Sequence, residues 1–431
     1  MKPIPKSPLN KITLLLILPL LLTAGLWAWL TLSLAQAQGD DEGLWRTLDT
    51  PFERVGRVLE DQEGNIWAVS WVGEALESSE KITDYEEILG QGDAITQTQS
   101  GASVSFVTIP GEGLAKFEQG RWITYTVEST NGNLPGDSIP AALCDRAGNL
   151  WLAVAANKTI SDTVRLADVG VVRFDGQDWQ TFTVTNTDGG LASNSVRDIF
   201  EDDAGNLWFA TLDGLSRYDG QTWEVVADKN DLGAEGVARV FQDSQSRLWV
   251  GLFDFEDGMG IPRGVARSAP VSADGTVAGW QTFTEADGLV HDFVLSVAED
   301  DEGNIWLGTV NGVSRFNGTG WGIFTPADSD LPGALVSHVV AGYEGQMWAA
   351  TNEGAAEYAG EQWQPFGNSE PTFNIFKDSE RLVWFSTGNG LRYYTDYHRQ
   401  TFREESGDLG SNDVRDLIEA SDGAIWAGTY G

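Results

Sequence analysis

The sequence predicts an all-β protein, a β-propeller of four-stranded antiparallel blades. The first observation is a motif that recurs along the chain: Val-x-x-Ile-x-x-Asp-x-x-Gly-Asn-Leu-Trp, then Gly-Leu-x-Arg-Tyr-x-Gly and a second Trp. Its clearest copy runs from Val196 to Trp223, and another runs from Val294 to Trp321. The second observation is the period of roughly forty residues, and the third is that each unit holds four β-rich segments. Together they are the signature of a propeller.

Each unit divides into strands a to d. Strand a begins twelve residues before the first Trp, strand b carries that Trp, strand c is Gly-Leu-x-Arg-Tyr, and strand d carries the second Trp. Large aromatic side chains at fixed repeat positions are typical of blade-packing residues. The tryptophans of strand b are Trp67, Trp151, Trp208, Trp249, Trp306, Trp348, Trp384 and Trp426. Those of strand d are Trp122, Trp179, Trp223, Trp280, Trp321 and Trp363.

The copies number about nine, and the last is incomplete. The gap between Trp67 and Trp151 is long enough for an additional degenerate unit near Phe106, recognised by Gly113 and Trp122 in its later part. Nine copies fit a larger ring, or a seven-bladed ring followed by the start of a second. A strand around Trp45 is a candidate to supply strand d to a late blade and so to close a ring.

The link between strands a and b carries Asp six residues and Gly three residues before the Trp, as in Asp202 and Gly205. Asp bonds the backbone two residues on and Gly permits positive φ, so this pattern is typical of a hairpin turn. It lacks the alternating ligands and the distal Glu of a calcium loop.

Two copies are enlarged between strands b and c, at Ala155 to Val169 and at Phe253 to Pro262. In an antiparallel blade these connections emerge on the face opposite the a–b turns. Long loops on a rigid scaffold commonly carry binding sites, so we expect binding on that face.

A mostly polar position lies within strand a, ten residues before the Trp, between apolar neighbours. Such a position in the innermost strand is expected to face the central channel. Together these positions would form a ring of residues around the channel, which we call the channel ring. It is interpreted either as a ligand funnel or as the lining of a water-filled channel. The predicted ligand-binding residues are Arg57, Asp198, Arg239, Ser296, His338, Asn374 and Asp416, with Ala141 as the apolar member.

The net charge of the chain is −37, from 27 basic and 64 acidic residues. Nucleic-acid binding needs a basic surface, so no nucleic-acid partner is expected. The charge indicates a solvated surface or, alternatively, calcium loading or a cationic ligand.

The N-terminus differs from the rest of the chain. Lys2, Lys6 and Lys11 precede an apolar run from Ile12 to about Ala35 and an Ala-x-Ala site. We interpret residues 1–38 as a signal peptide or as an uncleaved membrane anchor, and residues 43–431 as the propeller. The propeller is therefore expected to be extracytoplasmic, periplasmic or at the cell surface, and anchored or secreted.

No catalytic, metal or cofactor site is predicted. One cysteine, Cys144, excludes an intrachain disulfide, and we expect it to be a small buried residue. The three histidines are far apart, and no Gly-x-Ser-x-Gly elbow or phosphate-cradling glycine loop occurs.

The Asp-x-x-Gly-Asn-Leu-Trp and Gly-Leu-x-Arg-Tyr-x-Gly signature, with Leu191, Ser193 and Asn194 leading into strand a, resembles the two-component regulator propeller repeats. The resemblance extends over about residues 43 to 431. It implies the extracytoplasmic sensor of a bacterial membrane histidine kinase or hybrid two-component protein, with glycans often the ligand. In such receptors a β-sandwich, a membrane helix and cytoplasmic signalling domains usually follow the propeller, whereas this sequence shows no sandwich, no second membrane span and no kinase domain.

We therefore expect a non-catalytic ligand-sensing module of a two-component phosphorelay, and favour the view that the sequence is a fragment of a longer receptor. The alternative is a stand-alone secreted or surface binding propeller, and a propeller lyase or glycosidase is less favoured. The expected partners are a small molecule or glycan, the membrane through residues 1–38 if they are retained, and a second copy in a homodimer.

Overall fold

The computed structural model describes residues 46–48, 50–52, 54–70, 73–76, 106–109, 111–160, 163–256, 259–343, 345–367, 369–394 and 399–430. The expected signal or anchor at 1–38 and the expected strand around Trp45 lie outside these residues. Thr47–Gly431 forms one compact unit.

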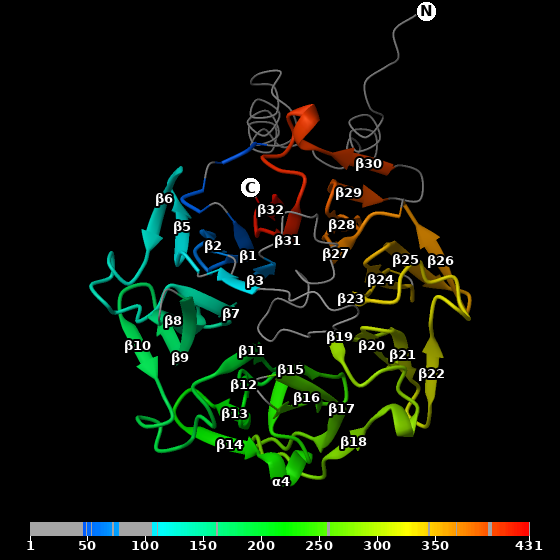
Figure 1. Cartoon of the computed structure of the whole chain (residues 1–431), viewed down its shortest axis with the longest axis horizontal. Coiled ribbons are helices and arrows are strands. Elements are labelled where there is room, and N and C mark those ends of the chain that lie inside the picture. The colour runs from blue at the N-terminus through cyan, green and yellow to red at the C-terminus, as the bar shows by residue number, and fades with distance from the viewer. Residues whose placement is uncertain are drawn as a thin grey trace, which may run out of the picture. The chain divides into compact units, whose positions relative to one another are not determined.

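Seven four-stranded antiparallel sheets follow one another around a ring, each with its first strand nearest the centre (Figure 1). We number these sheets as blades 1 to 7. Blade 1 holds β1 (Val55–Glu60), β2 (Ile66–Ser70), β5 (Leu114–Glu118) and β6 (Arg121–Tyr125). Blade 2 holds β7 (Ser138–Cys144), β8 (Leu150–Ile160), β9 (Thr163–Phe174) and β10 (Trp179–Phe182). Blade 3 holds β11 (Val196–Glu201), β12 (Leu207–Thr211), β13 (Gly214–Tyr218) and β14 (Trp223–Ala227).

The remaining blades keep the same order. Blade 4 holds β15 (Gly236–Gln242), β16 (Arg247–Glu256), β17 (Met259–Pro270) and β18 (Gln281–Phe283). Blade 5 holds β19 (Val294–Glu299), β20 (Ile305–Thr309), β21 (Gly312–Phe316) and β22 (Trp321–Phe324). Blade 6 holds β23 (Val336–Ala341), β24 (Met347–Thr351), β25 (Gly354–Ala359) and β26 (Gln362–Phe366). Blade 7 holds β27 (Thr372–Lys377), β28 (Val383–Thr387), β29 (Gly390–Tyr394) and β30 (Arg399–Phe402).

A two-stranded sheet, β31 (Val414–Glu419) with β32 (Ile425–Thr429), lies between blade 7 and blade 1 (Figure 1). We call it the closing sheet. β31 packs beside both β27 and β1, and Trp426 joins an apolar cluster with Val55 and Val58 of blade 1. The ring is thus closed by seven complete blades and the closing sheet.

The expectation of nine copies is wrong, because the degenerate unit near Phe106 is not a separate blade. β5, which carries Lys116, pairs directly with β2, so that Trp67 lies opposite Lys116. The intervening strands β3 (Gly73–Leu76) and β4 (Phe106–Ile109) pair with each other as a separate hairpin. The long gap between Trp67 and Trp151 is therefore an insertion between strands b and c of blade 1.

The core lies between neighbouring blades, and strand b supplies most of it. Alternate side chains of a strand point to opposite faces, so β12 contributes to two layers. Trp208 packs against blade 4 with Val240 and Leu248, whereas Phe209 packs against Trp151 of blade 2. The strand-b tryptophans of the seven blades are all at most 6% exposed. The prediction that they are packing residues is confirmed.

In the described part of the chain, three short helices lie in the connections from strand d to the next strand a. They are α4 (Lys229–Leu232), η1 (Glu285–Asp287) and η2 (Glu404–Ser406). In α4, the Asp228 side chain accepts hydrogen bonds from the amides of Asn230 and Asp231, which satisfies donors at the helix start. None of the helices in the described part of the chain has the length and apolar character of a membrane span.

Candidate ligand-binding face

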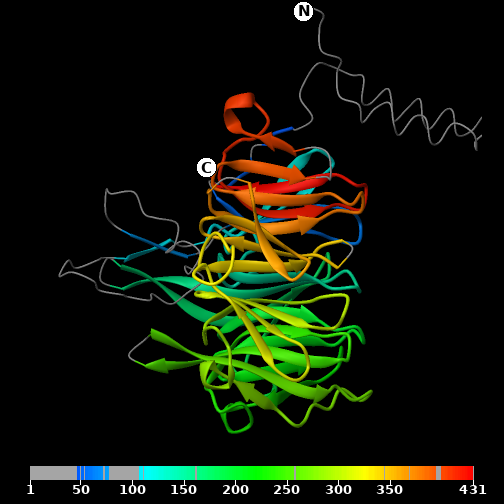
Figure 2. The same ribbon diagram turned by 90° about the vertical axis from the view of Figure 1, so that its right-hand side faces the viewer.

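The two faces of the ring differ in how regular they are. We call the face that carries the a–b turns the turn face, and the face that carries the b–c hairpins and the d–a connections the hairpin face. In the side view, strands of blades 1, 2 and 4 project well beyond the ring on the hairpin face (Figure 2). Irregular extensions on an otherwise repetitive scaffold are where propellers place binding residues.

The projections of blades 1 and 2 are neighbours. In blade 1 the β3–β4 hairpin pairs from Gly73↔Ile109 to Leu76↔Phe106. In blade 2, β8 and β9 stay paired out to Ile160↔Thr163. β4 packs beside β9. The two insertions therefore form one continuous projection above adjacent blades.

The projection of blade 4 carries a compact polar group. β16 and β17 stay paired out to Glu256↔Met259. On β16, the Asp254 carboxylate accepts the Glu235 amide at 2.9 Å and forms an ion pair with Arg263 of β17. Glu235 in turn accepts the Phe255 amide at 3.1 Å. These contacts tie the projecting hairpin to the connection from blade 3.

Aromatic side chains accompany this polar group. The rings of Phe253 and Phe255 lie 5.5 Å apart in an edge-to-face arrangement. Phe253 is buried, while Phe255 and Asp254 are half-buried. The side chain of Arg263 is 45% exposed. Because successive side chains of a strand point to opposite faces, Phe253 and Phe255 lie on one face of this hairpin and the ion pair of Asp254 with Arg263 lies on the other. The projection thus offers both apolar surface and charged groups, as small polar ligands require.

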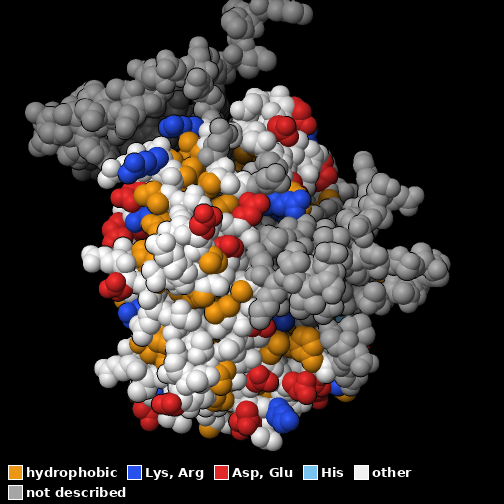
Figure 3. All heavy atoms as spheres, turned by 60° about the vertical axis from the view of Figure 1, so that its left-hand side comes forward, with side chains coloured by type: hydrophobic (Ala, Val, Ile, Leu, Met, Phe, Trp, Pro, Cys, Tyr) orange, Lys and Arg blue, Asp and Glu red, His pale blue; other side chains and the backbone are white. Residues whose placement is uncertain are grey.

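The described surface on one side of the molecule carries its acidic charge dispersed rather than gathered. Figure 3 shows acidic side chains scattered among uncharged atoms on the described surface of one side, with basic side chains between them. In the part of the chain that the structure describes, no three His, Cys, Asp or Glu side chains are placed to hold a metal ion.

The turn face is structural, as the sequence predicts. In blade 3 the Asp202 carboxylate accepts the amides of Ala204 and Asn206 at 2.9 and 2.8 Å. Its second oxygen accepts the indole N–H of Trp208 at 2.9 Å. Burial raises the pKa of the equivalent Asp61, but the hydrogen bonds from Trp67 and Asn65 outweigh it, and the pKa lies below its ordinary value. The carboxylate stays ionised and holds the turn to strand b.

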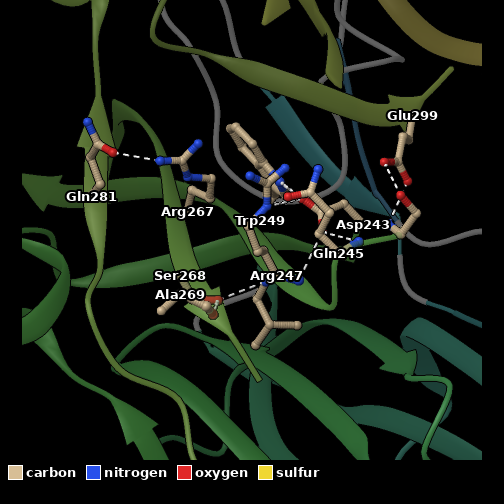
Figure 4. Close-up of polar contacts among 11 residues, drawn as sticks. Asp243, Gln245, Arg247, Trp249, Arg267, Ser268, Ala269, Gln281 and Glu299 are labelled. Atoms are coloured by element: carbon tan, nitrogen blue, oxygen red, sulfur yellow. Dashed lines mark hydrogen bonds and ion pairs between the residues drawn. The ribbon is translucent and has the colours of Figure 1, made fainter. Parts of the chain in front are cut away.

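Blade 4 carries a variant of this turn (Figure 4). Asp243 accepts the Trp249 indole N–H at 2.8 Å, and Arg247, in place of the usual Asn, pairs with the same carboxylate at 2.6 Å. Across the blade, Arg267 lies 5.6 Å from the Trp249 ring and donates to Gln281 at 2.8 Å. Every one of these side chains has a protein partner, so this cluster stabilises the blade.

Blade 6 departs from the pattern because Gly342 stands where the other blades have Asp. A Cβ on Gly342 would lie 2.7 Å from the Trp348 indole nitrogen. That nitrogen is buried and has no hydrogen-bond partner among the described residues. The Trp348 side chain occupies the space that the carboxylate fills elsewhere.

The predicted channel residues contact the backbone of the next blade. Asp198 of β11 accepts the Val240 amide of β15 at 3.2 Å. Ser296 of β19 accepts the Val339 amide of β23 at 3.0 Å. In both cases the amide belongs to the residue that follows the predicted channel residue of the next blade.

The contacts continue around the ring to its closure. Nδ1 of His338 accepts the Ile375 amide of β27 at 3.2 Å. Asn374 donates to Asp416 of the closing sheet at 3.1 Å, and Asp416 accepts the Val58 amide of β1 at 2.9 Å. Thus the same rule joins blade 6 to blade 7 and the closing sheet to blade 1.

The two arginines reach carbonyl groups instead. Arg57 donates to the Ala142 carbonyl of β7 at 2.9 Å, and Arg239 donates to the Leu295 carbonyl of β19 at 3.4 Å. The seven predicted polar residues therefore belong to a series of blade-to-blade hydrogen bonds, which sequence reasoning did not foresee and which is interrupted at blade 2, where Ala141 has no polar side chain. Their role in ligand binding remains a prediction.

Burial shifts the pKa of two of these inner-strand residues, His338 and Asp416. It lowers the pKa of His338 to about 4, so the imidazole is neutral at pH 7 and its Nδ1 is free to accept the Ile375 amide. Burial also raises the pKa of Asp416, although Arg57 and the hydrogen bonds from Val58, Leu417 and Asn374 oppose this shift.

Cys144, at the end of β7, is only half-buried, less than the sequence predicts. Burial, with nearby carboxylates, raises the pKa of its thiol to about 12. A thiol that stays protonated at neutral pH is a poor nucleophile.

Three segments of the chain match the family model described as the two component regulator propeller: residues 190–213, 288–311 and 408–431. They span the approach to strand a, the a–b turn and strand b of blade 3, blade 5 and the closing sheet. These three segments match the two-component regulator propeller repeat. No curated protein matches the sequence.

Several solved structures are similar to this propeller at low sequence identity. The PorZ protein of Porphyromonas gingivalis, a surface component of the type-IX secretion system, is 15% identical with a TM-score of 0.52, over 90% of this chain and 47% of that one. Two structures from B. thetaiotaomicron are described as extracellular domains of hybrid two component systems. BT3049 is 20% identical, with a TM-score of 0.47 and coverages of 88% and 55%. BT4673 is 18% identical, with a TM-score of 0.40 and coverages of 89% and 51%. The chain spans about half the length of these structures.

Proposed function

We propose that the propeller is the extracytoplasmic, non-catalytic ligand-sensing part of a membrane two-component receptor, and that it binds a small molecule or glycan on its hairpin face. The observation that carries the proposal is the enlargement of three b–c hairpins on one face of an otherwise regular ring. The regulator repeats and the export-type N-terminus support a sensor role outside the cytoplasm.

Two features favour the hairpin face over the central channel as the ligand site. The channel residues already bond to neighbouring blades, so a ligand would have to compete with the contacts that hold the ring together. On the hairpin face, Arg263 offers a charged side chain that is 45% exposed, and the half-buried Phe255 adds aromatic surface to the same projecting hairpin. Rigid scaffolds with variable loops bind in this manner.

The test is a thermal-shift and calorimetric screen of the full chain against oligosaccharides and small polar metabolites. A ligand that binds wild type is expected to bind Arg263→Ala at least about tenfold more weakly, since a charge-assisted hydrogen bond contributes about 1.5–3 kcal/mol. Arg121→Ala is the matched control, because Arg121 is an exposed arginine at the start of β6 on the turn face. Equal loss in both variants would contradict the proposed site.

The same ligand distinguishes the alternatives. Turnover of a bound polymer by the purified chain would favour the lyase or glycosidase reading over a sensor. Binding without turnover, together with a receptor whose output follows ligand concentration, would support the sensor. Binding without any signalling partner would favour a stand-alone binding propeller.

A further inference from the structure

A glutamate bridges four junctions of the ring on the turn face. It is the last residue of strand a, and it accepts the amide of the second residue of the a–b turn in the unit before it. Glu201 of blade 3 accepts the Arg146 amide at 2.9 Å, and Glu299 of blade 5 accepts the Ser244 amide at 2.6 Å. The same contact joins Glu419 to Ser379 and Glu60 to Ser421.

The junction between blades 6 and 7 lacks this carboxylate. Lys377 stands at the end of β27, where those units have Glu. Its ammonium group donates to the Gly342 carbonyl at 3.2 Å, and it cannot accept a hydrogen bond. Tyr343 is the second residue of the blade 6 turn, and among the described residues no acceptor contacts its amide. Since Gly342 also replaces the turn Asp, this junction has lost two carboxylates and kept the donors.

A second cation is held at this junction against the preference of the backbone. Arg381 has φ of 70°, at the turn position that glycine occupies in blades 1, 2, 3, 5 and 6 and that Ser246 occupies in blade 4. The left-handed conformation is unfavourable for a residue with a Cβ, and such residues are concentrated at functional sites. The Arg381 guanidinium lies 5.3 Å and the Lys377 ammonium 5.2 Å from the centre of the Tyr343 ring. Both cationic residues are exposed.

The carboxylates near Tyr343 are engaged elsewhere. Burial, with the nearby carboxylates of Asp378 and Glu419, raises the pKa of Tyr343. Asp378 accepts the Trp384 indole N–H at 2.7 Å, and Glu419 accepts the Ser379 amide at 2.7 Å. Each of these carboxylates therefore serves its own turn or junction, and neither replaces the acceptor that is missing beside Tyr343.

We propose that the turn face between blades 6 and 7 binds the carboxylate of a small acidic ligand, through Lys377, Arg381 and the Tyr343 amide. The ligand carboxylate takes the place of the glutamate that bridges four other junctions. A guanidinium and an ammonium group are the side chains that bind a carboxylate most strongly. The donors lie within a single junction, which suits a small molecule. The site is separate from the hairpin face and does not rest on ligand binding there.

The test titrates the full chain with glutarate and with glutaramide, its neutral counterpart. Glutarate is expected to bind, to slow hydrogen exchange of the Tyr343 amide, and to bind more weakly as salt is added. Glutaramide is expected to bind at least about tenfold more weakly, because hydrogen bonds to a charged group are the stronger ones. Equal binding of the two compounds would overturn the proposal. So would an unprotected Tyr343 amide at roughly 10 mM glutarate, tenfold above a Kd of about 1 mM.

Three variants locate the site. Lys377→Glu supplies the bridging carboxylate from the chain itself, so it is expected to abolish glutarate binding and to protect the Tyr343 amide without ligand. Arg381→Gly removes the second cation and the unfavourable φ, and is expected to weaken binding about tenfold while Tm stays equal or rises. Arg121→Glu makes the same charge change at an exposed turn-face arginine and is expected to leave binding unchanged.

The variants also state what would contradict the site. Glutarate binding that survives Lys377→Glu, or that falls equally in Lys377→Glu and Arg121→Glu, would overturn the proposal. A lower Tm with unchanged binding in Arg381→Gly would show that Arg381 is only structural, and would also overturn it. If Lys377→Glu fails to fold, the comparison of glutarate with glutaramide on the wild-type chain still decides.

Discussion

At the scale of single residues, one carboxylate in nearly every repeat organises the turn face. In six of the seven blades an Asp closes the a–b turn and holds the indole of the strand-b Trp, through the pairs Asp61–Trp67, Asp145–Trp151, Asp202–Trp208, Asp243–Trp249, Asp300–Trp306 and Asp378–Trp384. The sequence alone predicts the turn bond, because Asp and Gly at that spacing are local signals. It does not reveal the indole bond, which depends on how the hairpin folds back on strand b.

Asp202→Ala is therefore expected to lower the free energy of unfolding by about 2–3 kcal/mol, because it leaves two amides and a buried indole N–H unpaired. Asp203→Ala, the next residue and a highly exposed one, is expected to cost less than about 0.5 kcal/mol. Urea unfolding followed by tryptophan fluorescence measures both. Equal losses would contradict the assigned role of Asp202.

His338 makes stability depend on pH. Its pKa is about 4 in the folded protein against an ordinary 6.5, so the unfolded chain binds more protons between these values. The stability contributed by the neutral imidazole is full above pH about 6.5 and is lost as the pH falls toward 4. His338→Gln should flatten this part of the Tm–pH curve, and an unchanged slope in the variant would contradict the account.

The channel ring shows where residue-level prediction reached its limit. A polar position between apolar neighbours in the innermost strand predicts a side chain that faces the central channel. The period cannot say whether that side chain ends in solvent or on a neighbouring strand. Asp198 and Ser296 bond the next blade because successive inner strands lie side by side, which is a property of the assembled ring.

At the scale of secondary-structure elements, strand c depends on its first glycine. Gly214 has φ of 120°, and a Cβ there would lie 2.3 Å from the Ala227 carbonyl oxygen of β14. The same close approach to strand d recurs at Gly170, Gly264, Gly312 and Gly390. The glycine in the Gly-Leu-x-Arg-Tyr motif thus permits both the backbone conformation and the contact with strand d.

Gly214→Ala should destabilise the protein by about 3 kcal/mol, because it adds a steric clash to unfavourable backbone geometry. Gly220→Ala is a matched control, since Gly220 also has positive φ, 93°, but has nothing within 4 Å of its Cβ position. It should cost about 1 kcal/mol. Thermal denaturation followed by circular dichroism compares them, and a larger effect at Gly220 would contradict the packing argument.

Strand identity was predictable from the sequence, whereas strand partnership in blade 1 was not. The motif at Gly113 to Trp122 correctly indicates strands c and d. Assigning them to a separate blade fails because a hairpin is inserted before them, and a repeat count assumes that neighbouring segments pair. Blades 2 and 4, where the inserted strands continue β8 and β16, did not create this ambiguity.

At the scale of the whole molecule, closure of the ring of blades joins segments that are far apart in sequence. Glu60 of blade 1 accepts the Ser421 amide at 2.8 Å and its hydroxyl at 2.7 Å, and Asp416 accepts the Val58 amide. The equivalent contact between consecutive blades is that of Glu299 with Ser244, at 2.6 and 2.7 Å. The chemistry of the two contacts is alike, but only the closure contact lacks a short covalent connection.

Glu60→Ala should therefore speed hydrogen exchange in β1 and β31 more than Glu299→Ala does in β15 and β19. Loss of the closure contact is expected to cost about 1–2 kcal/mol locally. Native-state exchange read by mass spectrometry resolves these strands. Equal effects of the two variants would indicate that closure does not rest on this carboxylate.

The most direct test of the sensing account is a hydrogen-exchange map of the full chain with and without a bound glycan or small polar ligand. The account predicts protection in the hairpin face, at the β3–β4, β8–β9 and β16–β17 projections and the d–a connections beside them, with the a–b turns unchanged. Protection confined to the a–b turns, or to the inner strands that carry Arg239 and Asp416, would contradict the placement of the ligand site on the hairpin face.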